Sequence, residues 1–135
     1  MSVPQDILVA IRSDADIVAA RQQGRSLAAT LGFTATDATL IATAISELAR
    51  NIVSYAGQGE VAMSGVESAQ GKGIVICARD SGPGIRSIDD VLRDGYSTSG
   101  GLGLGLPGVR RLMDEFNIES ELQRGTVVTV RKWLK

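Results

Sequence analysis

Apolar residues recur at helical spacing in two long segments of the chain. The first segment begins after Ser13 and Asp16, which are spaced like a capping box, and ends at Gly32, a residue typical of helix ends. Its apolar stripe contains Ile17, Ala20, Gly24, Leu27 and Leu31. The second segment runs from about Thr36 to Tyr55, and its stripe contains Ile41, Ile45, Leu48, Ile52 and Tyr55. Because residues three or four apart share one face of a helix, both segments are predicted to be amphipathic helices.

Shorter segments have the alternation or the apolar character of β-strands. Strands are predicted near Gln5–Ile11, Glu60–Val66, Gly73–Asp80, Ile118–Leu122 and Thr126–Trp133. The run from Ile74 to Ala78 is continuously apolar, as expected for a strand that is covered on at least one face. A third long helix is predicted over about Gly105–Phe116, and a single helical turn around Ile88–Leu92. The apolar face of the third helix would contain Leu106, Val109, Leu112, Met113 and Phe116.

The order of these segments favours a single α+β domain. The chain has 135 residues, the size of one domain, and no repeat or linker divides it. We therefore predict one domain over residues 1–135, built from four or five strands and three main helices. The predicted architecture is a two-layer sandwich in which a mixed, mostly antiparallel sheet carries helices on one face.

Charge and composition exclude several classes of function. Fourteen Lys and Arg residues against fifteen Asp and Glu residues give a net charge of −1. With no basic excess to neutralise phosphates, nucleic-acid binding is not expected. The single cysteine, Cys77, permits neither an internal disulfide nor a thiolate metal cluster. No apolar run has the length of a membrane span and the start of the chain lacks a signal-peptide pattern, so we expect a soluble, cytoplasmic protein that contacts no membrane.

Histidine is absent from the chain. Its absence excludes Ser-His-Asp and Cys-His catalysis, imidazole metal sites and self-phosphorylation on histidine. Any acid–base chemistry must therefore use carboxylates.

Glu47 and Asn51 are the first candidates for such chemistry. They lie four residues apart in the second predicted helix, so both project from the same side, at the edge of the apolar stripe. A carboxylate there can accept a proton, and an amide oxygen can bind Mg²⁺, which prefers few protein ligands together with waters and phosphates. Taken alone, such a pair is more often a solvated glutamate and a surface asparagine.

Asp80 directly follows the apolar strand and precedes Gly82 and Gly84. A carboxylate at a strand end can accept a hydrogen bond from an exocyclic amine such as that of adenine, and the glycines permit the backbone to approach a flat ring closely. Gly125 and Thr126 begin the last strand, where the threonine hydroxyl could support Asp80 through a hydrogen bond or a water. Each piece alone is also typical of an ordinary turn.

A glycine-rich segment opens the third predicted helix, which has Pro107 in its first turn. It contains Ser99, Gly100, Gly101, Leu102, Gly103, Leu104 and Gly105. Free N–H groups and the helix dipole at such a place form an anion cradle, and glycines let the backbone wrap around phosphate oxygens. The segment is neither a dinucleotide-binding fingerprint, since no short strand-to-helix turn precedes it, nor a Walker A motif, since no Gly-Lys-Ser/Thr follows.

In order along the chain, these four clusters resemble the GHKL ATPase superfamily, which has the Bergerat-type ATP-binding fold. The resemblance implies that Asn51 holds Mg²⁺, that Asp80 binds the adenine amine, that Gly101–Gly105 wraps the phosphates of ATP, and that Glu47 is the general base. The residues it places at the nucleotide are Asn51, Asp80, Gly82, Gly84, Ser99, Gly100, Gly101, Leu102, Gly103, Leu104, Gly105 and Thr126.

Within that superfamily, the short chain and the missing histidine favour the free-standing serine/threonine kinases of bacterial partner switching. Several segments resemble the stressosome switch kinases most closely, including Ala44–Asn51, Asp94–Gly101 and the terminal Lys132–Lys135. The resemblance implies a kinase that phosphorylates STAS-domain proteins and, once released, binds and activates a metal-dependent protein phosphatase. It also places Arg21 at the partner interface, although a solvated basic face is an equally good interpretation of that residue.

Other functions remain open from the sequence alone. One is an anti-sigma factor kinase, another is a binding module in which nucleotide only sets the conformation, and a third is an ATPase without a protein substrate. An arginine is also expected to complete the site, and Arg50, Arg79 and Arg93 are equal candidates.

Overall fold

Eight helices and strands make up the part of the chain that the structure describes. The structure is a computed structural model and describes residues 6–69, 71–82, 105–121 and 124–135. Its elements are β1 (Ile7–Ile11), α1 (Asp14–Leu31), α2 (Ala35–Tyr55), β2 (Gly59–Ser68), β3 (Gly71–Asp80), α4 (Gly105–Leu112), β4 (Glu115–Glu121) and β5 (Gly125–Trp133). The helical turn predicted around Ile88–Leu92 lies outside these residues.

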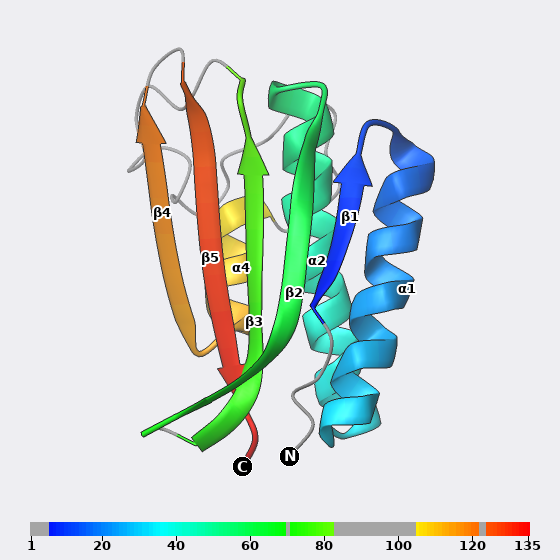
Figure 1. The fold of residues 1–135 in the computed structure, drawn as a ribbon, viewed down its shortest axis with the longest axis vertical. Helices are drawn as coiled ribbons and strands as arrows, with labels where there is room; N and C mark the ends of the chain where they lie inside the picture. Colours follow the sequence, from blue (N-terminus) through cyan, green and yellow to red (C-terminus); the bar gives the residue numbers. More distant parts are fainter. Residues whose placement is uncertain (1–5, 70, 83–104, 122–123) are drawn as a thin grey trace.

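The strands form one sheet in the order β1-β2-β3-β5-β4, with the helices on one face (Figure 1). Every pair of neighbouring strands is antiparallel within the described residues. The predicted α+β architecture, a mostly antiparallel sheet with helices on one face, is therefore confirmed. Among the described strands, β1 and β4 are the edge strands, because they stand at the two ends of this order.

The first helix begins and ends at the residues that the sequence indicates, and the second begins at Ala35, one residue before its predicted start near Thr36. The Asp16 carboxylate accepts a hydrogen bond from the Ser13 N–H at 3.2 Å, which satisfies one of the free donors at the start of α1. Gly32 ends the helix in the left-handed conformation, with φ of 105°. Thr34 caps α2 by accepting a hydrogen bond from the Asp37 N–H at 3.1 Å.

The third helix is shorter than predicted, and Phe116 belongs to a strand. α4 ends at Leu112, whose carbonyl accepts a hydrogen bond from the buried Lys132 Nζ at 2.9 Å. The Asp114 N–H already donates to a strand carbonyl, that of Arg131, at 2.9 Å. Phe116 then pairs with Val130 across β4 and β5. The boundary was missed because Phe116 fits both the helical spacing from Met113 and the alternation with Ile118.

The core lies between the helices and the inner face of the sheet. Its largest fully buried side chains are Ile11, Ile41, Ile45, Leu48, Val61, Met63, Ile74, Ile76, Val109 and Val130. They come from α2, from α4 and from four strands, and the predicted stripe of α2 supplies three of them. Tyr55, the last residue of that stripe, is 39% exposed, because it lies at the end of α2. None of the described helices is long and apolar enough to cross a membrane.

Candidate functional site

Glu47 is a buried carboxylate on the inner side of α2. Its residue is 7% exposed, and its Oε1 accepts a hydrogen bond from the N–H of Gly105, the first residue of α4, at 3.0 Å. Its Oε2 pairs with the guanidinium of Arg50. A buried carboxylate is costly unless it is paired and hydrogen-bonded, and these two contacts supply that compensation.

Asn51 lies one helical turn beyond Glu47. Its Nδ2 is buried, and no hydrogen-bond partner for it exists among the described contacts. Because nearly all buried polar groups in folded proteins are hydrogen-bonded, an asparagine whose Nδ2 is left in this state can donate to an acceptor atom of a ligand, such as a phosphate oxygen. Its oxygen is of the type that Mg²⁺ accepts, so the residues at this place fit a magnesium–nucleotide complex.

Asp80 lies at the end of β3 on the helix side of the sheet. Alternating burial along β3 places Ala78 and Asp80 on the inner face and Arg79 on the outer face. The Asp80 Oδ1 accepts a hydrogen bond from the Gly82 N–H at 2.9 Å, which turns the chain away from the strand. A carboxylate has about four lone-pair sites, so further acceptor capacity remains for the amine of a base.

The ends of three strands crowd around Asp80. Its register partners are Gly59 in β2 and Thr126 in β5. A Cβ at Gly59 would lie 2.2 Å from the Arg79 carbonyl oxygen, and a Cβ at Gly82 would lie 2.5 Å from the Ala56 Cβ. Both positions therefore need glycine for the close approach.

Gly125 provides a test of how closely β5 approaches Asp80. A Cβ at Gly125 would lie 2.0 Å from the Asp80 carbonyl oxygen, and the backbone has φ of +117°. We expect Gly125→Ala to lower the free energy of unfolding by about 2 kcal/mol more than Gly71→Ala, because overpacking adds to backbone strain. Gly71 is a matched control, since its φ is +118° and nothing lies within 4 Å of its added Cβ. Equal losses in urea unfolding would mean that the backbone strain alone matters at Gly125.

Thr126 is buried opposite Asp80, but its hydroxyl has another partner. The Thr126 Oγ1 lies 3.0 Å from the Ser120 Oγ, across β4 and β5. No direct hydrogen bond from this hydroxyl to Asp80 is among the described contacts, and support of Asp80 through a water stays a prediction. The threonine instead joins the edge strand β4 to the strand beside Asp80.

The structure brings the predicted residues into two groups that share one helix. Glu47, Asn51 and Gly105 form one group, in which residues 58 positions apart are hydrogen-bonded. Asp80, Gly82 and Thr126 form the other. The C-terminal end of α2 links them, since Ala56, which directly follows this helix, contacts the Gly82 position. The remaining nucleotide-binding candidates lie outside the described residues: Gly84, Ser99, Gly100, Gly101, Leu102, Gly103 and Leu104.

The three candidate arginines are no longer equivalent. Arg50 contacts Glu47, whereas Arg79 lies on the opposite face of the sheet, and Arg93 is outside the described residues. A hydrogen bond with the Cys77 side chain and the nearby Glu60 carboxylate raise the pKa of Arg79 on that outer face. Arg21 is exposed on α1, as a partner contact would require.

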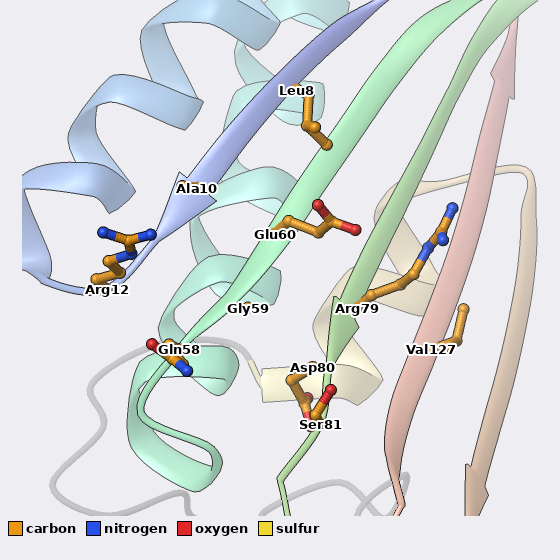
Figure 2. Close-up of a pocket in the computed structure, with 10 residues that line it drawn as sticks. All are labelled: Leu8, Ala10, Arg12, Gln58, Gly59, Glu60, Arg79, Asp80, Ser81 and Val127. Carbon is orange, nitrogen blue, oxygen red and sulfur yellow. The ribbon is translucent and has the colours of Figure 1, made fainter.

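A cavity on the outer face of the sheet was not predicted from the sequence. It has a volume of about 530 Å³, and Figure 2 shows Glu60, Arg79 and Val127 on the strands that form its floor. Asp80 and Ser81 lie at its end, where β3 leaves the sheet (Figure 2). Asp80 belongs both to this cavity and to the predicted site, whereas Glu47 and Asn51 do not line the cavity. The alternation in β3 indicates that Arg79 and Asp80 lie on opposite faces of the sheet. The pairing of β1 with β2, which brings Leu8 and Ala10 to the cavity, has no local signal in the sequence.

Comparison with known proteins identifies the family of the chain. A family model described as a histidine kinase-like ATPase domain matches residues 12–132. The chain belongs to this family. Serine/threonine-protein kinase RsbT of Bacillus subtilis (strain 168) is 54% identical over 127 residues, which cover 94% of this chain and 96% of RsbT. Anti-sigma F factor of Clostridium kluyveri is 28% identical over 98 residues, covering 70% of this chain and 69% of that protein.

Membership of the histidine kinase-like ATPase family confirms the resemblance that the four motifs indicated. The identity to RsbT extends over nearly the whole of both chains and supports protein kinase activity. In a family of ATPase domains, use of ATP follows directly.

Proposed function

We propose that the chain is an Mg-ATP-dependent serine/threonine kinase that phosphorylates STAS-domain proteins of a stressosome-type partner-switching module. It would act as one domain over residues 1–135. The observation that carries the proposal is that the buried Glu47 carboxylate and the Asn51 amide lie one helical turn apart on α2. The similarity to RsbT, whose name states serine/threonine-protein kinase activity, supports it.

Glu47 has the position and the capacity for a general base. In the proposed reaction, the partner hydroxyl oxygen forms a bond to the γ-phosphorus while the bond from that phosphorus to the β–γ bridging oxygen breaks. ADP leaves with those electrons, and the hydroxyl proton passes to a Glu47 carboxylate oxygen. Both oxygens are hydrogen-bonded, but each carboxylate oxygen has a second lone pair that can accept the proton. Such a base contributes typically about 10²–10⁴-fold to the rate.

Asn51 and Asp80 would bind the two ends of the nucleotide. Asn51 would hold Mg²⁺, which neutralises charge on the transferring phosphoryl group when it is bound. Asp80 would accept a hydrogen bond from the adenine amine. Gly105 belongs to the glycine-rich phosphate segment, and its N–H is directed at Glu47. The base and the phosphate segment are thus connected by one hydrogen bond.

Phosphorylation itself would release the partner. A phosphate adds about −1.5 to −2 charges to an interface fitted to a neutral hydroxyl. Unless that charge finds a new cation, the complex is weakened. The freed kinase would then bind and activate a metal-dependent protein phosphatase. We assign Arg21, exposed on α1, to the partner-binding surface.

A partner-release experiment tests this proposal. A STAS-domain protein from the same genome is immobilised, the kinase is bound to it, and release is followed after adding Mg-ATP or a non-hydrolysable analogue. We expect rapid release with Mg-ATP and retention with the analogue, since release requires transfer of the phosphoryl group. Equal release by both nucleotides would instead show a nucleotide-gated binding module.

A second candidate function rests on the weaker similarity to anti-sigma F factor. A chain of this kind would bind a sigma factor, with kinase activity directed at an antagonist of that complex. Co-purification of a sigma factor with this chain from its own host would favour this candidate. The groups at Glu47, Asn51 and Asp80 suit both functions, so the nucleotide site does not separate them.

A further inference from the structure

Arg50 contacts the proposed general base from the same helix. The two residues are spaced i and i+3 on α2, and the Arg50 guanidinium pairs with the Glu47 Oε2. The Arg50 side chain is 42% exposed, whereas that of Glu47 is only 9% exposed. The pair therefore joins a solvated cation to a buried anion.

An ordinary pair of this spacing on a helix surface has little effect on stability or function. This pair differs because one partner is buried. With Arg50 removed, the described contact left on the Glu47 carboxylate is the Gly105 N–H, and the freed Oε2 would be buried without its cation. The carboxylate would then rotate toward water, because a buried charge without sufficient partners is costly.

Orientation of that carboxylate matters for the reaction. A general base must lie within hydrogen-bond reach of the proton it accepts, about 2.6–3.2 Å between heavy atoms. A displacement of about 1 Å at a reacting group can lower a rate by about 100-fold. A guanidinium is suited to hold a carboxylate, because its planar array of N–H donors fixes direction as well as distance.

We propose that Arg50 is a positioning residue that holds the Glu47 carboxylate in the orientation from which it accepts the substrate proton. The inference rests on the proposed kinase function. Arg50 would act through Glu47 and would not itself contact the phosphates. Arg79 is unsuited to this task on the opposite face of the sheet.

The test compares Arg50→Met and Arg50→Lys with wild type in steady-state phosphorylation of the STAS-domain partner. Methionine removes the guanidinium but keeps the side-chain length, and lysine keeps the charge without the planar donors. We expect Arg50→Met to lower kcat about tenfold, with a change of less than about twofold in the KM for ATP, and Arg50→Lys to recover part of the loss. A raised KM with unchanged kcat would instead assign Arg50 to nucleotide binding and overturn the proposal.

The same substitution is then made in a Glu47→Gln background. If Arg50 acts through Glu47, Arg50→Met has no further effect on the residual rate, since coupled residues are not additive. A second, independent tenfold loss would overturn the proposal.

Arg131→Ala is the matched control. Arg131 pairs with Glu115 at 3.9 Å on the outer side of the sheet, and the two side chains are 38% and 43% exposed. Its kcat should stay at the wild-type value. Thermal unfolding of each variant checks that the fold is kept. Absence of phosphorylation by wild type would refute the kinase function and this inference together, whereas an active wild type with a fully active Arg50→Met variant would refute only this inference.

Discussion

Replacing Glu47 by glutamine is expected to lower the rate of phosphoryl transfer by about 10²–10⁴-fold, the usual contribution of a general base. ATP binding should stay near the wild-type value. Glutamine has nearly the same shape, and its amide oxygen can still accept the hydrogen bond from the Gly105 N–H. Single-turnover transfer from ATP to the STAS-domain partner measures the rate, and calorimetric titration with ATP measures binding.

The pattern of these two results separates a chemical from a structural role of Glu47. A lower rate of phosphoryl transfer with unchanged ATP affinity supports Glu47 as the general base. If ATP affinity and the melting temperature fall together with the rate, the Glu47–Gly105 hydrogen bond mainly maintains the structure of the site. Glu47→Ala, which removes that hydrogen bond as well, should weaken binding more than Glu47→Gln does.

Replacing Asp80 by asparagine is expected to weaken ATP binding by about 10–100-fold. The substitution removes a charge-assisted hydrogen bond to the adenine amine, and such bonds contribute about 1.5–3 kcal/mol. The turn at the end of β3 should be preserved, because the asparagine Oδ1 can still accept from the Gly82 N–H. Calorimetric titration with ATP measures the change.

Asp114→Asn serves as the control for Asp80→Asn. The Asp114 Oδ2 accepts a hydrogen bond from the Trp133 N–H at 2.8 Å, so both aspartates accept from a backbone donor near a strand end. Asp114 lies where α4 joins β4, at the other end of β5 from Thr126. Asp114→Asn should leave ATP binding unchanged. If Asp80→Asn also binds ATP with wild-type affinity, Asp80 does not recognise the adenine.

Much of the fold follows from local signals in the sequence. Ser13, Gly32 and the α2 stripe identified the first two helices because capping and amphipathic spacing involve neighbours within one or two turns. The end of α4 could not be identified in this way. It depends on hydrogen bonds from Lys132 and to Arg131, which are distant in sequence and close only in the folded sheet.

In the candidate site, too, local contacts were predictable from the sequence and contacts between distant residues were not. The spacing of Glu47 and Asn51 indicated that both lie on one side of a helix, and the position of Asp80 after an apolar strand indicated a strand end. The hydrogen bond from Gly105 to Glu47 joins residues 58 positions apart, and no local pattern indicates it. The Arg50 contact had a signal, the i,i+3 spacing, but its importance depends on the burial of Glu47, which only the packing of α2 and α4 establishes.

The most direct single test is the intact mass of the STAS-domain partner after incubation with Mg-ATP and either wild type or Glu47→Gln. We predict that wild type adds one phosphoryl group to a serine or threonine of the partner, and that Glu47→Gln adds almost none in the same time. A partner that binds wild type tightly yet keeps its unmodified mass would contradict the assignment of this chain as a kinase of such proteins.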